Sequence, residues 1–404
     1  MNLKKAKIIF FDFYYSVLKP VIKFFFALLI KIYLHTLPRK TLEPQKIKNV
    51  LILISPQNGL GDNIMFSYYI EDLINTYDLN ICITTSHPQF WSLLEYRNLY
   101  IITCKNTKTL FKEIINSKQK FDLAIILSPY VQHLLTLPFI NAPYKIGYDP
   151  IHLIKRRKKI GLINNFKINS EKKIEFDGTD DFYGYMLKLA LEYCGFSVKE
   201  KIPKIKKYIH HQNEDLSSGF ILVYPYAKDS LRALPTFFWV KVCERLCEEG
   251  FEVVLLSTNE ALDLTNEILS QVKCSVKSIF TDSIEKTIFI LNKAYCCICT
   301  DGGFMHIALL SDIPNIIAFF NLVKKEHRIP STILSKKIKT FQIENDKIRN
   351  YLDLFSSTKY KSFFEYKPKI VKEVLKEYEN EVENLFKTEY KNFLDEIIEF
   401  LKAR

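Results

Sequence analysis

The chain reads VLILIS at residues 50–55 and NGLGDN at residues 58–63. An uninterrupted run of apolar and β-branched residues is typical of a strand buried on both faces of a parallel sheet. The glycines after it predict a tight turn, and the amphipathic stretch at residues 63–77 predicts a helix. Strand, glycine turn and helix in this order indicate an α/β fold.

The same unit recurs along the chain, so two parallel sheets, each covered by helices, are expected. In the first half, further strands are predicted at residues 81–85, 100–104, 123–127 and 145–148. After a basic and less regular stretch, strands are predicted at residues 221–224, 252–256, 276–280, 296–300 and 315–319. The helices of this second half are predicted at residues 235–249, 260–271, 283–293 and 303–310.

The chain has 404 residues, which is too long for one core of ordinary size. A charged stretch with apolar residues at helical spacing begins at Lys367 and predicts a terminal helix. We expect four parts: an apolar and basic extension over residues 1–48, a Rossmann-like domain with a basic linker over residues 49–218, a second Rossmann-like domain over residues 219–322, and a helical tail over residues 323–404.

The composition points to an anionic partner and a reducing compartment. The formal net charge of +12 favours a partner such as nucleic acid, an acidic membrane or a phosphorylated substrate. The chain has nine cysteines, and the one pair with CxxC spacing, Cys296 and Cys299, lies in an apolar run that predicts a buried strand, which argues against a zinc site. We therefore expect reduced cysteines that pack as small apolar side chains in a cytosolic protein.

The N-terminal extension contains the apolar stretch VIKFFFALLIKIYL at residues 21–34. Lys23 and Lys31 interrupt it, and its longest charge-free run, residues 24–30, falls short of the roughly 20 residues that a spanning helix needs. No cleavage site follows, so a secretory signal is not expected. Two arrangements stay open: a helix that lies in the membrane interface, and a helix docked on the first domain.

The glycine turn at residues 58–63 differs from the common nucleotide-binding loops. Ile64 stands where the GxGxxG fingerprint needs its third glycine, and no GK[ST] follows. The remaining GxGD pattern places Asp62 at the mouth of a parallel sheet, where a carboxylate can take a proton from an attacking hydroxyl. The alternative is that Asp62 only caps the helix.

A second glycine turn reads DGGFMH at residues 301–306, again between a buried strand and a helix. The Gly302 and Gly303 amides at a helix start can bind phosphate oxygens. Asp301 and His306 are candidates to orient that ligand. A histidine on a helix is also commonly a structural hydrogen-bonding residue, and that alternative stays open.

Two further loops carry polar side chains at the same edge of the second sheet. The loop at residues 224–235 offers Lys228, Ser230 and Arg232 to a pyrophosphate, with Arg232 the better bidentate donor. Glu260 follows the next strand and can accept hydrogen bonds from both ribose hydroxyls of a nucleotide. The alternatives are an ordinary solvated loop and a common first-turn glutamate.

Taken in order, these four segments resemble the motifs of glycosyltransferase family 9, the ADP-heptose:lipopolysaccharide heptosyltransferases. Asp62 falls on that family's general base, Arg232 on the basic residue of its donor-phosphate loop, and Glu260 on its nucleotide-ribose carboxylate. Residues 301–308 are similar to the family's D[ST]GxxH[LI]A segment, with Gly302 in place of the Ser or Thr. Tyr224 replaces the histidine that opens the phosphate loop.

The resemblance implies a GT-B arrangement of two Rossmann-like domains that face each other across a cleft. The first domain would bind the acceptor with Gly59, Gly61 and Asn63, beside the catalytic Asp62. The second would bind the sugar nucleotide through Lys228, Ser230, Arg232, Glu260, Asp301, Gly302, Gly303 and His306. The implied reaction is one inverting displacement without a metal ion or other cofactor, because cationic side chains and helix amides would neutralise the leaving diphosphate.

The resemblance also implies the partners. The sugar would be a heptose carried by ADP-heptose, and the acceptor an anionic lipopolysaccharide or lipid A core. No nucleic acid is expected. The enzyme would be cytoplasmic, with peripheral contact to the inner face of the inner membrane. The basic run at residues 155–159 would meet the acceptor or form a solvated loop.

Two alternatives to this function stay open. One is a family member that transfers a different sugar to an outer-core or capsule acceptor. The other is a catalytically inert protein of the same fold that binds a sugar nucleotide or a lipid. Turnover of an activated sugar separates the inert protein from the enzymes.

Overall fold

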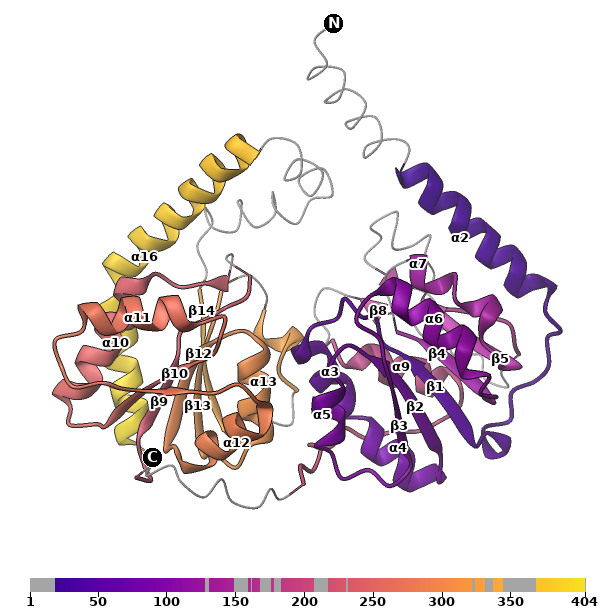
Figure 1. Cartoon of the computed structure of the whole chain (residues 1–404), viewed down its shortest axis with the longest axis horizontal. Helices are drawn as coiled ribbons and strands as arrows, with labels where there is room; N and C mark the ends of the chain where they lie inside the picture. The colour runs from indigo at the N-terminus through magenta and orange to yellow at the C-terminus, as the bar shows by residue number, and fades with distance from the viewer. Residues whose placement is uncertain are drawn as a thin grey trace, which may run out of the picture. The chain divides into compact units, whose positions relative to one another are not determined.

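The chain folds into two compact units, one within residues 13–206 and one within residues 207–404. The computed structural model describes residues 19–127, 131–148, 159–160, 162–167, 176–177, 183–206, 217–229, 232–321, 324–330, 337–343 and 368–403. Within these ranges each unit holds one six-stranded sheet covered by helices (Figure 1). The predicted α/β class with two Rossmann-like domains is therefore confirmed.

The sheet of the first unit is parallel except at one edge. Its strands are β1 (Asn49–Leu53), β2 (Asn80–Thr85), β3 (Leu99–Thr103), β4 (Leu123–Ile126), β5 (Tyr144–Tyr148) and β7 (Leu162–Asn164). They follow the order β3-β2-β1-β4-β5-β7, and β7 runs antiparallel to β5. The central strands β1 and β4 are almost wholly buried, as their continuous apolar runs predict.

Helices in the first unit are α3 (Leu60–Ser67), α4 (Ile70–Tyr77), α5 (Pro88–Ser92), α6 (Thr107–Ser117), α7 (Val131–Leu134) and α9 (Tyr185–Tyr193), with 3-10 turns η2 (Pro44–Lys46) and η3 (Leu137–Phe139). The single helix predicted over residues 63–77 is wrong: α3 ends before Tyr68, and the Tyr69 N–H bonds to the Phe66 carbonyl in a tight turn. A small antiparallel pair joins β6 (Lys159–Ile160) to β8 (Phe176–Asp177). Residues 155–158 of the basic run lie outside the described residues.

The apolar N-terminal stretch forms α2 (Lys19–Thr36), which packs on the first unit. Ile30 and Leu34 are buried in a core cluster that also contains Leu51 and Leu53 of β1. The opposite face of α2 exposes large apolar side chains, namely Val21, Ile22, Phe24, Phe25, Leu28, Leu29 and Ile32. The docked arrangement is thus present, and it leaves a second apolar face uncovered by the described residues.

The sheet of the second unit is wholly parallel. It contains β9 (Ile221–Tyr224), β10 (Val253–Ser257), β11 (Lys277–Phe280), β12 (Cys296–Thr300), β13 (Asn315–Phe320) and β14 (Ile338–Gln342). The order is β11-β10-β9-β12-β13-β14. β14 lies in the part that the sequence assigns to a helical tail. Its sequence, IKTFQ, is only partly buried at the sheet edge and so lacks the apolar run of a central strand.

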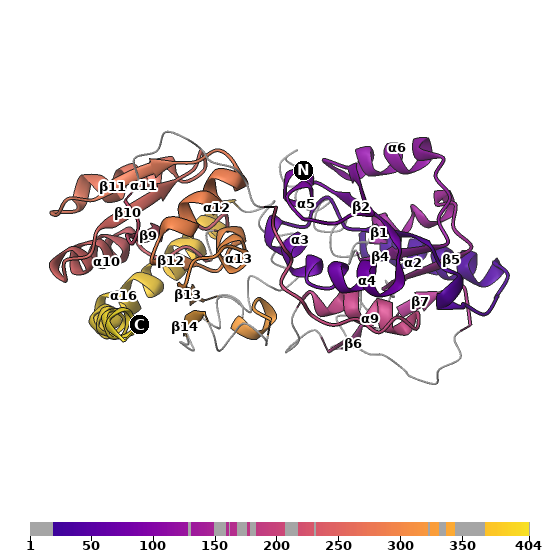
Figure 2. The ribbon, with the colours of Figure 1, turned by 90° about the horizontal axis from the view of Figure 1, so that it is seen from below.

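Helices cover both faces of the second sheet (Figure 2). They are α10 (Thr236–Glu248), α11 (Leu262–Gln271), α12 (Ile284–Lys293), α13 (Gly303–Leu310), the short 3-10 turn η5 (Lys325–His327) and the long α16 (Pro368–Lys402). α16 packs against α10 and joins the core of this unit through Tyr378, Val382 and Phe386, among others. The predicted C-terminal helix is therefore confirmed.

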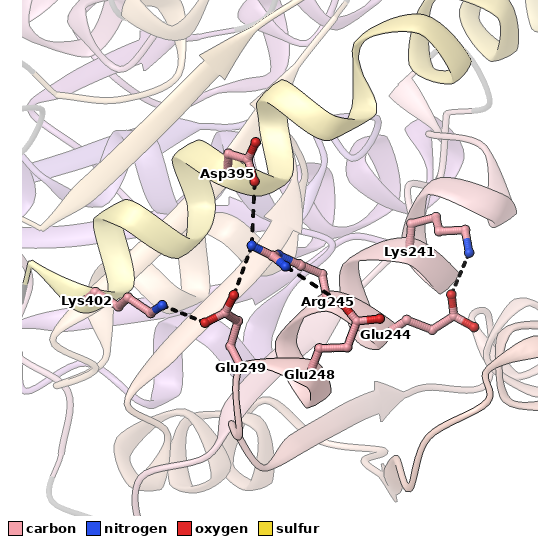
Figure 3. A network of polar contacts seen from close by, with 7 residues as sticks. All are labelled: Lys241, Glu244, Arg245, Glu248, Glu249, Asp395 and Lys402. Atoms are coloured by element: carbon pink, nitrogen blue, oxygen red, sulfur yellow. Dashed lines mark hydrogen bonds and ion pairs between the residues drawn. The ribbon is translucent and has the colours of Figure 1, made fainter.

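Ion pairs border the contact between α10 and α16 (Figure 3). An Arg245 nitrogen lies 2.9 Å from a Glu249 oxygen and 3.7 Å from an Asp395 oxygen on α16. The Lys402 amine lies 2.6 Å from Glu249. These charges are partly exposed, so we expect them to contribute little compared with the apolar core beneath them.

All nine cysteines are free thiols, and seven of them are buried. Among the described residues, no helix combines the length and the apolar character needed to cross a membrane.

Candidate active site

Each sheet has a switch point, where successive connections leave in opposite directions. In the first sheet this point lies between β1 and β4, and in the second between β9 and β12. Ligands of doubly wound sheets bind at the carboxyl ends of the strands beside such a point. The turn with Asp62 follows β1, while Arg232 and Asp301 follow β9 and β12. The predicted motifs therefore occupy the expected binding position of each sheet.

Asp62 lies in the first turn of α3, where its side chain is half-buried. Its Oδ2 accepts a hydrogen bond from the Gly59 backbone N–H at 3.1 Å and from the Asn58 amide nitrogen at 3.0 Å. The capping role considered from the sequence is therefore present. It is compatible with proton transfer, because a carboxylate has about four lone-pair positions on its two oxygens.

Gly59 shows why the turn can approach a ligand closely. It is exposed and has a φ of −71°, which any residue adopts. A Cβ atom placed on it would have no heavy atom of the described structure within 4 Å. Neither the backbone nor the packing requires glycine here, and the space above the turn is open. Gly61 lies in the first turn of α3 and is partly exposed.

Two of the three predicted acceptor residues are glycines, and the side chain of the third, Asn63, faces the interior. It is fully buried. Its Oδ1 accepts hydrogen bonds from Thr85 Oγ1 at 2.8 Å and from the Trp91 indole N–H at 3.0 Å, and its Nδ2 donates to the Gly59 carbonyl at 2.9 Å. The side chain of Asn63 therefore supports the turn from inside the unit, in place of the exposed position expected of an acceptor contact.

In the second unit, a buried carboxylate lies between two arginines. Asp301 is only 2% exposed. Its Oδ2 lies 3.5 Å from Arg232 Nη1 and 3.9 Å from Arg328 Nε. Neither oxygen of Asp301 has a hydrogen-bond partner among the described residues. The cluster therefore holds two cations and one anion at ion-pair distances, directly at the start of α13.

His306 lies on α13 beside this cluster and is buried. Burial, reinforced by the positive charges of Arg328 and Arg232, lowers the pKa of His306 to about 3. The imidazole is therefore neutral near pH 7, and its Nδ1 has no hydrogen-bond partner in the described part of the chain. A neutral imidazole offers one donor and one acceptor, so His306 can orient a ligand by hydrogen bonding but cannot neutralise a phosphate.

The other predicted donor residues lie around the same edge. Gly302 and Gly303 begin α13, and a Cβ atom at Gly302 would lie 4.0 Å from its nearest neighbour, the Thr300 carbonyl oxygen. Lys228 and Glu260 are exposed in the loops after β9 and β10. Ser230 lies outside the described residues.

Tyr224 is the last residue of β9 and lies at the same edge of the sheet. Its ring lies 4.4 Å from the ring of Phe304 between centroids, and its hydroxyl lies 3.4 Å from Thr258 Oγ1. Burial raises the pKa of Tyr224 to about 12, so the phenol stays neutral. A neutral aromatic pair, whose rings are tilted by 30°, thus stands where the resemblance expects a histidine.

Sequence reasoning missed Arg328. It ends the turn η5, which follows β13, so it arises from the next loop at the carboxyl edge of the same sheet. The rule that identified Arg232 and Glu260, a polar residue shortly after a parallel strand, would have identified it. Among the described residues, no group of three or more His, Cys, Asp or Glu side chains could hold a metal ion.

Comparison with known proteins identifies a family. The model of glycosyltransferase family 9 (heptosyltransferase) matches residues 117–355, which is more than half of the 404-residue chain. No curated protein matches the chain at a significant level.

Solved structures share the fold at low sequence identity. A family 9 glycosyltransferase from Veillonella parvula is 15% identical with a TM-score of 0.57, covering 78% of this chain and 90% of its own. The ADP-heptose lipopolysaccharide heptosyltransferase II of E. coli is 15% identical with a TM-score of 0.53, covering 74% and 91%. The E. coli heptosyltransferase WaaC, solved with ADP, is 12% identical with a TM-score of 0.54, covering 76% and 99%.

Proposed function

The chain belongs to glycosyltransferase family 9, and from this premise we propose that it transfers a heptose from a nucleoside-diphosphate donor to a lipopolysaccharide core, with inversion at the anomeric carbon. The observation that carries the proposal is Arg232 beside the buried Asp301 at the amino end of α13. A guanidinium group and helix amides together form a site for a diphosphate. ADP is proposed as the nucleotide because the similar WaaC structure contains it.

In the proposed reaction the donor binds the second unit. Arg232, with Lys228 and the amides of Gly302 and Gly303, stabilises the diphosphate as it leaves. Glu260 accepts hydrogen bonds from the ribose hydroxyls, and His306 orients the donor as a neutral hydrogen-bonding group. These contacts gain strength as negative charge develops on the leaving oxygen, so they lower the barrier and do more than bind the donor.

The acceptor binds the first unit in this mechanism, at the turn of Gly59 and Gly61. Its hydroxyl oxygen forms a bond to the anomeric carbon while the bond from that carbon to the diphosphate oxygen breaks. The hydroxyl proton passes to Asp62, and the nucleoside diphosphate leaves with the electron pair of the broken bond. A single displacement of this kind inverts the anomeric centre.

We propose that the reaction needs no metal ion, because guanidinium and amide donors supply the positive charge at the diphosphate. Purified protein should transfer heptose from ADP-heptose to a lipid A core acceptor in EDTA at the same rate as with added Mg²⁺ or Mn²⁺. The product is measured by mass spectrometry, and GDP- and UDP-sugars are tested in parallel.

Each outcome of this assay decides between the alternatives. Turnover that disappears in EDTA and returns with a divalent ion would contradict metal independence. Turnover of another sugar nucleotide would support the family member with a different donor. Nucleotide binding without turnover of any donor would favour the inert sugar-nucleotide-binding protein.

We also propose that α2 attaches the protein peripherally to an anionic membrane surface. Its buried face packs on the first unit, while its other face exposes Phe25, Leu28 and Ile32 within one stripe. Residues 19–42 contain five Lys and Arg residues and no Asp or Glu. An apolar helix face within a purely basic segment is typical of binding to the interface of acidic lipids.

Substitution of the exposed face tests this without disturbing the core. Removal of α2 would uncover Leu51 and Leu53, so we prefer the double variant Phe25→Ser/Ile32→Ser. Each side chain contributes roughly 1.5 kcal/mol or more when buried, so partition into phosphatidylserine vesicles should fall at least about tenfold in sedimentation assays.

The control is Phe139→Ser, on the same unit. Phe139 is 54% exposed and Phe25 is 56% exposed, but Phe139 lies outside α2. Partition should be unchanged in this control, and it should weaken for the native protein as salt rises. Equal partition of the native protein and the double variant would exclude α2 as the membrane contact.

A further inference from the structure

We propose that Arg328 is a second diphosphate-binding residue, which forms with Arg232 a two-arginine clamp around the leaving group. This inference rests on the proposed nucleoside-diphosphate donor. Arg328 comes from the loop after β13, whereas Arg232 comes from the loop after β9, on the other side of β12. The clamp would therefore join the two loops that flank the start of α13.

Asp301 lies at ion-pair distance from both guanidinium groups. Its Oδ2 is 3.5 Å from Arg232 Nη1 and 3.9 Å from Arg328 Nε, so a single carboxylate oxygen lies near both guanidinium groups. The side chains of Arg232 and Arg328 are 23% and 16% exposed, and that of Asp301 is 2% exposed. Two partly exposed cations thus lie above one buried carboxylate, which is the order expected for a site that receives an anion from solvent.

The described ion pairs of the cluster join two guanidinium groups to the one buried carboxylate of Asp301. Asp229 lies 4.0 Å from Arg232 Nε, but its side chain is 46% exposed, so water screens that contact. His306 adds no charge, because its lowered pKa keeps it neutral. The positive charges of the two arginines would attract the negatively charged diphosphate.

The carboxylate of Asp301 is a buried polar group that, within the described part of the chain, lacks the hydrogen bonds it could accept. Both oxygens of Asp301 lack a hydrogen-bond partner among the described residues, although the side chain is almost fully buried. A buried polar group without such a partner costs free energy, and functional sites are where this cost is retained. Phosphate oxygens accept hydrogen bonds, so a diphosphate would bind to the guanidinium N–H groups, and the buried carboxylate would orient those groups from below.

Gly302, at the start of α13, also bears on how the phosphates would be bound. Its φ of −175° is an extended conformation open to any residue, and a Cβ atom would have its nearest neighbour at 4.0 Å. The fold therefore has room for a side-chain hydroxyl here, yet the sequence supplies none. With no hydroxyl donor at this position, the proposed hydrogen bonds to the phosphates come from the arginines and the helix amides.

The test is calorimetric titration with ADP and AMP, and with GDP and UDP and their monophosphates. Arg328→Gln should raise the dissociation constant of the diphosphate about tenfold or more, as expected for a charge-assisted contact. The monophosphate should lose less affinity, so the diphosphate-to-monophosphate affinity ratio should fall. Arg232→Gln should act in the same direction, and Arg328→Lys should retain part of the affinity.

The control is Arg245→Gln, which removes a guanidinium group from the same unit. Arg245 pairs with Glu249, at the end of α10, and with Asp395 on α16 (Figure 3). Its nucleotide affinities should equal those of the native protein.

A lowered melting temperature with an unchanged affinity ratio in Arg328→Gln would show a structural role and overturn the clamp. Unchanged affinity in Arg328→Gln with weakened binding in Arg232→Gln would also overturn it, while the proposed function stands. If the native protein binds none of these nucleotides, the proposed donor itself is wrong.

Discussion

Asp62→Asn should lower turnover by roughly 10²–10⁴-fold, the contribution expected of a general base. The amide keeps the shape of the carboxylate but cannot take the proton of the attacking hydroxyl. The affinity for the nucleoside diphosphate should stay near that of the native protein, because the proposed donor residues all lie in the other unit. Steady-state transfer rates and calorimetry measure the two quantities separately.

The structure shows what this substitution does to the helix. Asp62 Oδ2 accepts hydrogen bonds from the Gly59 N–H and the Asn58 amide. The carbonyl oxygen of the introduced amide can accept the same two hydrogen bonds, so the melting temperature should remain close to that of the native protein. A pure capping role predicts nearly native turnover instead, and that result would send the search for the base to other carboxylates of the first unit.

Asn106→Ala gives the matched control, because it removes a helix cap from the same unit. The Asn106 side chain accepts a hydrogen bond from the Thr109 N–H at 2.9 Å at the start of α6. Its loss should cost about 1 kcal/mol of stability and leave turnover unchanged. The two variants should therefore show opposite patterns: lost turnover with native stability for Asp62→Asn, and lost stability with native turnover for Asn106→Ala.

The central strands could be predicted from the sequence because burial on both faces leaves an unmistakable pattern. β9 and β12 have the predicted bounds, since ILVY and CCICT are short apolar runs that end at turn residues. The edge strands β7 and β14 could not be predicted in this way. LIN and IKTFQ are only partly buried, so their sequences carry no pattern that separates them from loops.

The loops of the candidate site could be located, but the roles of their side chains depend on partners that are distant in sequence. Asn63 looks like a substrate contact within its motif, yet Thr85 and Trp91 from two other elements occupy its oxygen. Arg328 lies outside every motif, and only the fold brings it to Asp301. Spacing along the chain predicts which edge of a sheet a residue reaches, and it does not predict which neighbour the side chain meets.

Phe386→Ala should lower the stability of the second unit by about 3–5 kcal/mol, the cost expected for removing a buried phenylalanine. Phe386 lies on α16 and is fully buried in the core of that unit. Its ring is 4.6 Å from that of Phe238 on α10, measured between centroids. A detachable tail would make no such contacts, so this variant tests whether α16 belongs to the domain that carries the donor loops.

Thermal unfolding measures the effect. A loss of 3–5 kcal/mol should lower the melting temperature by about 6–20 °C for a unit of this size. The unfolding transition whose temperature rises when a nucleoside diphosphate binds belongs to the second unit, because a ligand stabilises the domain that binds it.

The control is Lys387→Ala, at the next position and exposed, which should change stability by no more than about 0.5 kcal/mol. If Phe386→Ala melts like Lys387→Ala, α16 does not stabilise the core of the donor domain. If only Phe386→Ala melts early and still binds nucleotide at low temperature, α16 completes that core and the donor loops form independently of the lost ring.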